Sequence, residues 1–364
     1  MSSRKRSGDS AGITTEGESF ATPGPALHYA VEAAPPAGHA RQIAPGVTWL
    51  RMPLPIDLNH INLWLIEDGD GWTLIDTGYP AESCAEVWRR LETEPLLRER
   101  PLRRILLTHF HPDHMGLAGW LQARYDGLAV GFAPRGADAA RDMLSPMTPE
   151  SRATGAAYLE SHGFADAARF LEGLPRNFER QPLISMPRIT HALRDGERID
   201  IGAPWRVIEA EGHADAHQCF HGAAAGVLVS GDQVLPSISP NVSLSRQRWG
   251  TDPLGDFLAS LDRLDALPPD TLVLPSHGRP FRGLHARTAD LRAHHADQLQ
   301  RLLAQLAQPR AAYELLPMLF GRRLPGFHRM LAIHECIAHL EHLVRRGEAL
   351  RETDGAGLHR YRSA

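Results

Sequence analysis

Short apolar runs, each closed by glycine, proline or aspartate, dominate residues 43–283 and predict a domain that alternates strands with helices. The first run alternates apolar with polar residues, a second strand-like run follows, and Gly69-Asp70-Gly71 predicts a hairpin turn before the third. Apolar spacing of three and four residues predicts helices over residues 81–96 and 117–125. The predicted strands cover residues 47–52, 59–66, 72–75, 105–107, 128–132, 205–210, 226–230 and 271–274.

The C-terminal part of the chain changes to longer helical runs. Three such runs are followed by a short hairpin, which is the order of elements in a winged-helix unit. Gly347 supplies a C-cap after the last helix. The helical runs cover residues 284–306, 311–320 and 327–346, and the hairpin strands cover 348–352 and 358–362.

Two further segments differ in composition from the α/β pattern. Residues 1–42 are rich in serine, glycine, proline and alanine, which predicts a disordered or loosely attached segment. Residues 135–195 have mostly helical periodicity and predict an insertion that either covers a site or packs as a helical layer on the sheet. We therefore expect three units: residues 1–42, an α/β domain over 43–283 that contains the insertion, and a C-terminal domain over 284–364.

Composition narrows the class of protein. A hydrophobic content of 43% is ordinary for a soluble globular chain, and the net charge of −4 argues against a nucleic-acid-binding field over the whole surface. The three cysteines are widely separated, with no CxxC pair, so we expect a reducing cytoplasm. No apolar run approaches the roughly 18 residues that cross a bilayer, so we expect no membrane association.

Residues 108–116, Thr-His-Phe-His-Pro-Asp-His-Met-Gly, concentrate metal-ligating side chains directly after a predicted strand. His109 and His111 are two residues apart, so on an extended backbone they point to the same side. Asp113 and His114 follow where the chain turns toward a helix. Imidazoles suit zinc and iron, and a carboxylate suits harder ions or a position shared between two metals. The alternative is a polar loop in a chain with 20 histidines, but such density within six residues favours a metal site.

Three later strands also end in a strong ligand type, at His213, Asp232 and His277. If these strands share a direction in paired sheets, their carboxyl ends converge on one edge, and Asp232 could lie between two metals. Asp76 also follows a strand, where it either reaches the site or serves as an Asx turn or helix cap. The predicted ligand set is His109, His111, Asp113, His114, His213, Asp232 and His277.

Five segments together resemble the signature motifs of the metallo-β-lactamase-fold hydrolase superfamily, in the same order and with similar spacing. They are Asp76-Thr77-Gly78, residues 108–114, Gly212-His213, Gly231-Asp232 and Ser276-His277-Gly278. The resemblance covers about residues 43–283 and implies an αββα sandwich. It extends more loosely to a subgroup with a C-terminal winged-helix extension, the lactamase-β-like-2 type.

The resemblance also implies roles for single residues. His109, His111 and His213 would hold one metal, Asp113, His114 and His277 a second, and Asp232 would bridge them. Asp76 would orient the site rather than bind a metal. His217 matches a second histidine that often follows the third motif, and we interpret it as structural or as a support for the ligands. Glu211 stands where proline is common in the family, which could alter the shape or charge of the loop that carries His213.

A site of this kind predicts hydrolysis. Two divalent ions, Zn²⁺ with Fe or Mn as alternatives, would lower the pKa of a bridging water and supply hydroxide near neutral pH. The second metal, or Asp113 through a proton, would help the leaving group depart, and Asp76 would support the centre. His60, Tyr158 and Arg135 are predicted to contact the substrate. We expect a thioesterase-like or esterase-like hydrolase that acts on a small acyl substrate.

Two other function classes compete with this interpretation. One is a metal-dependent ribonuclease whose C-terminal arginines line a groove, although glutamates interleave with them. The other is a non-enzymatic role of the C-terminal domain in nucleic-acid binding or dimerisation, for which we favour packing and homodimer formation. A single-iron redox centre is disfavoured because both ligand sets are complete. The arginines are Arg322, Arg323, Arg329, Arg345, Arg346 and Arg351, and the glutamates are Glu335, Glu341 and Glu348.

Overall fold

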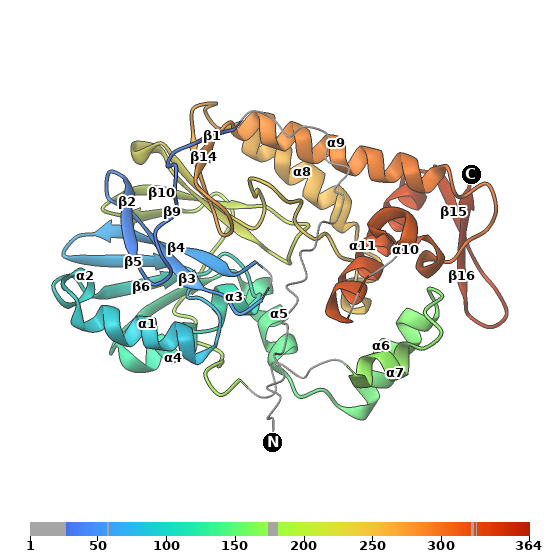
Figure 1. The fold of residues 1–364 in the computed structure, drawn as a ribbon, viewed down its shortest axis with the longest axis horizontal. Helices are drawn as coiled ribbons and strands as arrows, with labels where there is room; N and C mark the ends of the chain where they lie inside the picture. Colours follow the sequence, from blue (N-terminus) through green and yellow to red (C-terminus); the bar gives the residue numbers. More distant parts are fainter. Residues whose placement is uncertain (1–26, 57, 174–180, 322–323, 325) are drawn as a thin grey trace, which may run out of the picture.

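The computed structural model describes residues 27–364 except for residues 57, 174–180, 322, 323 and 325. Two seven-stranded sheets form the centre of the described chain (Figure 1). The first sheet consists, in spatial order, of β2 (Ala40–Ala44), β3 (Val47–Pro53), β4 (His60–Asp68), β5 (Gly71–Ile75), β6 (Leu102–Leu106), β7 (Ala129–Phe132) and β8 (His191–Ala192). The second consists of β1 (His28–Tyr29), β14 (Phe281–Arg282), β13 (Leu272–Pro275), β12 (Val227–Gly231), β11 (Gln218–Gly222), β10 (Ala203–Glu209) and β9 (Arg198–Ile201).

Helices cover the outer faces of both sheets. In Figure 1, α1 and α4 lie beside the first sheet, and α8 and α9 lie beside the second. Prolines occupy the first turn of several helices, where the missing N–H costs no helical hydrogen bond. The helices are α1 (Glu82–Thr93), α2 (Pro95–Arg98), α3 (Pro112–Met115), α4 (Ala118–Arg124), α5 (Pro134–Leu144), α6 (Pro149–Glu160), α7 (Ala167–Gly173), α8 (Pro253–Asp265), α9 (Leu284–Leu303), α10 (Ala312–Phe320) and α11 (Gly326–Arg345).

Three apolar clusters show that the layers are helix, sheet, sheet and helix. The middle cluster joins the inward faces of the two sheets, where Trp49 and Trp64 pack with Phe220. The two outer clusters join each sheet to its own helices. Ile105 and Leu106 illustrate the principle: neighbouring residues of one strand point to opposite faces, so Ile105 faces the helices and Leu106 faces the other sheet. The αββα sandwich implied by the sequence is confirmed.

The predicted hairpin at Gly69-Asp70-Gly71 is present, and it joins β4 to β5 in antiparallel register. The sequence-based strands missed β9 and β11, and also the short strands β1, β8 and β14. These three strands have two residues each, so they are defined by their hydrogen-bonded partners and leave almost no periodicity to read.

The predicted loosely attached segment, residues 1–42, is ordered in its last part. Residues 1–26 lie outside the described residues. His28–Tyr29 pairs with β14, and β2 pairs with β3 from Ala40 onward. The sheets therefore begin before the predicted boundary at residue 43. The polar composition concealed β2 because it is an edge strand whose first three residues are exposed.

The C-terminal helices α9, α10 and α11 are followed by a two-stranded hairpin of β15 (Ala349–Thr353) and β16 (His359–Ser363). This is the predicted order of elements, and the winged-helix identity remains a prediction. The side chains of His295 and His339 are buried and hydrogen-bonded to each other, 3.0 Å apart. They pack inside the helical region, as interpreted from their spacing. None of the helices in the described part of the chain is both long and apolar enough to cross a membrane.

The predicted insertion, residues 135–195, packs on two different parts of the molecule, the first sheet and the C-terminal helices. Helix α5 joins the core of the first sheet through Ala137 and Ala140. Helices α6 and α7 instead pack on the C-terminal helices, and Phe164 stacks on Tyr313 with ring centroids 4.4 Å apart. The insertion therefore connects the α/β domain to the C-terminal region rather than lying only on a sheet.

Candidate metal centre

Parallel strand pairs bring the ligand-bearing loops to one edge of the sandwich. In the first sheet β5 is parallel to β6, with Ile75 opposite Leu106, so Asp76 and the segment after residue 106 leave the sheet side by side. In the second, β12 is parallel to β13, with Gly231 opposite Pro275. Backbone hydrogen bonds join the two sheets here, from Asn62 N–H to Ser276 O (2.7 Å) and from Gln218 N–H to Thr108 O (2.8 Å).

All seven side chains predicted as ligands meet at this edge. The described residues contain two groups that could hold a metal ion, and within each group the ligand atoms lie within 4.8 Å of one another. Asp232 belongs to the first group and also faces the second, with its carboxylate oxygen Oδ1 3.5 Å from His114 Nε2. The first group is His109, His111, His213 and Asp232, and the second is Asp113, His114 and His277.

Hydrogen bonds on the far side of three imidazoles determine which nitrogen faces the centre. The Nδ1 atom of His213 lies 2.9 Å from the Asn241 carbonyl oxygen, and that of His277 lies 2.9 Å from the His60 carbonyl oxygen. The Nδ1 atom of His114 lies 2.8 Å from a carboxylate oxygen of Asp76. These oxygens only accept, so each Nδ1 carries a hydrogen, and the lone pair of the ring in its neutral form is on Nε2.

His109 is held in the same tautomer by a relay through Thr108. The Thr108 hydroxyl donates to Asp76 Oδ2 at 2.8 Å, so it accepts from His109 Nδ1 at 3.0 Å. His111 instead turns its Nδ1 inward, 2.9 Å from His109 Nε2 and 3.1 Å from His213 Nε2. Three imidazole nitrogens therefore point at one another.

Polar atoms without partners mark the second group. The Nε2 atoms of His114 and His277 and the Oδ1 atom of Asp232 are buried and have no hydrogen-bond partner among the described residues. Buried polar atoms in folded proteins are nearly always satisfied, and these three lie close together, with Asp232 Oδ1 3.5 Å from His114 Nε2 and 3.6 Å from His277 Nε2, an arrangement that suits a shared ion. Imidazole lone pairs and carboxylates are what Zn²⁺ and similar divalent ions bind, and these residues therefore fit such ions.

The electrostatics of the cluster also fit a cation. Burial, together with the neighbouring His213, lowers the pKa of His111 to about 3, so its ring is neutral near pH 7. Burial opposes charge on His114, but the carboxylates of Asp232, Asp113 and Asp76 outweigh it and raise the pKa of that ring. Burial likewise opposes ionisation of Asp113, yet His114 and His277 hold the pKa of that carboxyl at about 2. The carboxylates thus require positive charge at the centre.

Asp76 supports this centre from behind. It accepts from the Thr108 N–H (2.8 Å), the Thr108 hydroxyl (2.8 Å) and His114 Nδ1 (2.8 Å). Its backbone has φ of +61°, which aspartate tolerates better than most residues. Of the two sequence interpretations, the contacts favour the reach to the site: Asp76 is a positioning residue for His114 and His109.

The three predicted substrate residues lie in different places. His60 is behind His277: its Nε2 accepts from the Gly278 N–H (2.8 Å), and burial with the nearby Arg51 lowers its pKa to about 4. The Tyr158 hydroxyl donates to the Leu244 carbonyl (2.7 Å). Arg135 forms an ion pair with Glu211. All three therefore have protein partners, and contact with a substrate remains a prediction.

Glu211, which departs from the proline common in the family, has a role in this arrangement. Besides Arg135, it accepts from the Ala216 N–H at 3.3 Å, across the loop that carries His213. The ion pair between Glu211 and Arg135 thus connects the loop that carries His213 to the insertion.

Sequence reasoning missed Asn62 and Asn241 as parts of the site. Asn62 is fully buried in β4 and donates to the carbonyls of Pro275 and Gly278, both at 2.8 Å, on either side of His277. A polar residue between apolar neighbours in the 59–66 run was a detectable signal. Asn241 lies in an irregular loop and acts through its backbone carbonyl, so no residue pattern could have identified it.

Replacement of Gly212 by alanine should destabilise the loop that carries His213. Gly212 has φ of +117°, and an added Cβ would lie 2.5 Å from the Phe257 Cα atom of α8. Strain and clash together should lower the free energy of unfolding by roughly 3 kcal/mol, measured by urea denaturation. Gly226→Ala is the control, since Gly226 has φ of +62° with nothing within 4 Å of an added Cβ. Equal losses in the two variants would contradict the proposed clash.

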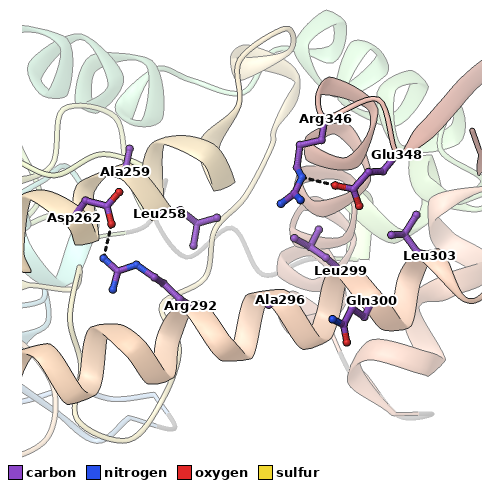
Figure 2. A pocket seen from close by; sticks show the side chains of 10 residues that line it. All are labelled: Leu258, Ala259, Asp262, Arg292, Ala296, Leu299, Gln300, Leu303, Arg346 and Glu348. Atoms are coloured by element: carbon purple, nitrogen blue, oxygen red, sulfur yellow. Dashed lines mark hydrogen bonds and ion pairs between the residues drawn. The ribbon is translucent and has the colours of Figure 1, made fainter.

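A cavity of about 520 Å³ lies away from this cluster, between α8 and α9 (Figure 2). None of its lining residues belongs to the seven-residue set. Its two arginines, Arg292 and Arg346, are paired with Asp262 and Glu348. The cavity contains no cluster of ligand or nucleophile side chains, so we assign the chemistry to the His/Asp centre.

Both the α/β domain and the C-terminal region match known protein families. Residues 56–277 match the model of the Metallo-beta-lactamase superfamily, and residues 299–364 match that of the Metallo-beta-lactamase-like, C-terminal domain. A beta-lactamase domain protein from Burkholderia ambifaria is 39% identical, with a TM-score of 0.84 over 93% of this chain and 98% of that one.

Two further relatives are more distant. The probable metallo-hydrolase YqjP of Bacillus subtilis is 24% identical over 298 residues, which is 74% of this chain and 84% of the relative. The acyl-coenzyme A thioesterase MBLAC2 of Bos taurus is 28% identical over 254 residues, 66% of this chain and 81% of that protein.

Proposed function

The chain belongs to the metallo-beta-lactamase superfamily as a metal-dependent hydrolase, and we propose that it uses two divalent ions, Zn²⁺ foremost, to cleave a small thioester or ester. The observation that carries the proposal is the pair of ligand groups with Asp232 facing both. One group offers three imidazole nitrogens, and the other offers two imidazoles and a carboxylate.

The residues of the centre would have different roles in hydrolysis. Divalent ions held by the two ligand groups would supply an activated water at neutral pH and would polarise the carbonyl oxygen of the substrate. Asp113, with a pKa of about 2, is ionised before the reaction, so it accepts a proton before it can pass one to the leaving group. Asp113 lies 3.4 Å from His277 Nε2, within the second ligand group. Asp76 and Asn62 keep the imidazoles oriented throughout.

Two observations support an acyl substrate. The relative MBLAC2 is named an acyl-coenzyme A thioesterase. Exposed apolar side chains also lie on the segments that border the centre: Ile56, before His60, is 51% exposed, and Ile238, after Asp232, is 43% exposed. Apolar surface of this kind suits the hydrocarbon part of an acyl group.

The arginines that a ribonuclease would need are engaged elsewhere. Arg351 pairs with Glu341 at 2.6 Å, and Arg346 pairs with Glu348 at 2.5 Å. Arg345 donates to the Gly250 carbonyl, and Arg329 donates to the Leu324 carbonyl at 3.0 Å. Arg322 and Arg323 lie outside the described residues. The paired arginines do not support a basic groove, so the hydrolysis of acyl compounds is the better proposal.

A substrate screen should find thioester or ester hydrolysis that depends on His111. The panel is acyl-CoA, acyl-glutathione, lactone, phosphodiester and RNA substrates, assayed with added Zn²⁺. The His111→Ala variant should lose at least about 10³-fold in kcat/KM, because it removes an inward-facing ligand. His39→Ala, an exposed histidine outside the centre, should behave as the unaltered protein. If RNA alone is cleaved, the substrate proposal is wrong; if no activity depends on His111, the mechanism is wrong.

A further inference from the structure

The loop between β12 and α8 connects the centre to the C-terminal region. It begins at Asp232 and reaches Asp252, and along its length it contacts α9 and α11, of which α11 lies within the C-terminal match. The described contacts lie on α9 and α11, and those on α11 continue to a ligand of the centre.

One chain of contacts runs from α11 directly to His213. The Asn241 carbonyl accepts from His213 Nδ1 at 2.9 Å, which orients the ring so that Nε2 faces the centre. The side-chain amide of the same residue, Asn241 Nδ2, donates to Glu335 Oε2 at 2.6 Å. One asparagine therefore holds a proposed ligand with its backbone and a C-terminal carboxylate with its side chain.

Other contacts hold the loop on both sides of Asn241. Arg287 of α9 donates to the carbonyls of Leu235 (2.6 Å) and Ile238 (2.7 Å). On the other side, the Leu244 N–H donates to the His334 carbonyl of α11 at 3.0 Å. The loop is thus fixed at its two flanks, and Glu335 fixes its middle.

Packing alone does not account for Glu335. Its side chain is 8% exposed in a helix whose neighbouring buried residues are mostly apolar, and a carboxyl in such surroundings is costly unless it has a specific partner. Burial raises the pKa of this carboxyl to about 7, while the Asn241 amide opposes the rise. An apolar residue would pack at least as well at this position. We therefore attribute the presence of Glu335 to its hydrogen bond with the Asn241 amide.

We propose that Glu335 is a positioning residue for the metal centre: it holds Asn241 so that the Asn241 carbonyl fixes the tautomer and orientation of His213. The C-terminal region would then contribute to the metal centre through α11. This helix would help to set the Zn²⁺ affinity of the group formed by His109, His111, His213 and Asp232. The inference rests on the proposed metal centre but not on the choice of substrate.

The test compares Zn²⁺ affinity among variants of the full chain. Metal-free protein is titrated with Zn²⁺ against a chelator, and the absorption spectrum of the Co²⁺-substituted protein reports ligand geometry. Glu335→Leu removes the acceptor at similar volume and should weaken Zn²⁺ binding about tenfold and shift the Co²⁺ spectrum. Asn241→Ala keeps the backbone carbonyl but loses the side-chain tether, so it should have the same effect, and the double variant should lose no more.

Two further variants separate positioning from general stability. Glu335→Gln keeps an acceptor oxygen for Asn241 and should restore Zn²⁺ affinity to within about twofold of the unaltered protein. Ile333→Ala, a buried position in the same helix, should lower the melting temperature without changing Zn²⁺ affinity or the Co²⁺ spectrum. If Glu335→Leu does not fold, Asn241→Ala carries the comparison.

Three results would overturn the inference. They are unchanged Zn²⁺ affinity in Glu335→Leu and Asn241→Ala, equal weakening in Ile333→Ala, or failure of Glu335→Gln to restore binding. A failure of the proposed function would look different, because the unaltered protein would then bind no Zn²⁺ at all.

Discussion

Replacement of Asp232 by asparagine is expected to lower kcat/KM by roughly 10³-fold, about 4 kcal/mol of transition-state stabilisation. The same change should reduce the metal content from about two ions per chain to about one. Asp232 is the side chain that faces both ligand groups, with its oxygens 3.4 Å from His213 Nε2 and 3.5 Å from His114 Nε2. An amide of the same shape has no charge and only one acceptor oxygen, so it cannot serve two cations.

Metal analysis and steady-state kinetics on the same preparations test this expectation. Asp262→Asn is the matched control, because Asp262 is a surface carboxylate on α8 paired with Arg292, outside both ligand groups. That control should keep both the metal content and the rate. Retention of about two ions and full activity in Asp232→Asn would contradict the bridging role. One ion or none in the unaltered protein would contradict the two-metal centre itself.

Replacement of Asp76 by asparagine should lower the free energy of unfolding by roughly 3 kcal/mol and activity by 10–100-fold. Asp76 accepts three hydrogen bonds of 2.8 Å, from two donors on Thr108 and one on His114. An asparagine would turn an NH₂ group toward at least one of these donors. Because asparagine also tolerates the φ of +61° at this position, the change isolates the lost acceptor from backbone strain.

Urea unfolding and metal titration distinguish this effect from a general loss of charge. Asp195→Asn is the comparison, since Asp195 is a partly exposed carboxylate paired with Arg263 at 2.6 Å, where the loss should be within about 1 kcal/mol. Asp76→Ala should be worse than Asp76→Asn, since alanine removes every acceptor and also strains the backbone. An Asp76→Asn protein as stable and as active as the unaltered chain would show that Asp76 does not position His114.

Much of the fold was predictable because its core elements are long and regular. The strand that begins with Val47 alternates apolar with polar residues, the strand that begins with His60 is a long apolar run, and the helices that begin with Leu284 and Gly326 have helical spacing. The elements that were missed include β9, β11 and α8, and also short strands that exist only through pairing. β2 lies in a segment whose composition resembles a flexible tail, and β1 and β14 have two residues each.

The candidate site also has residues that the sequence could predict and residues that it could not. The ligand types could be predicted from sequence because each follows a strand end, and because three imidazoles and a carboxylate within six residues favour metal binding over ordinary packing. Of their supports, Asp76 was predicted, but two others were not. His60, expected to contact substrate, hydrogen-bonds behind His277, and Asn241 acts through a backbone carbonyl that any residue would possess.

By itself, the sequence determined the identity of the candidate ligands, the strand ends that carry them and the layered α/β class, since these follow from periodicity and side-chain chemistry within short windows. Only the tertiary structure decided how the ligands meet. His111 and His213 are 102 positions apart, yet their inward nitrogens lie 3.1 Å from each other. Asn241 and Glu335 are 94 positions apart, and their contact is 2.6 Å. Such pairs depend on how two sheets and a helical region pack, and no local pattern of residues encodes that distance.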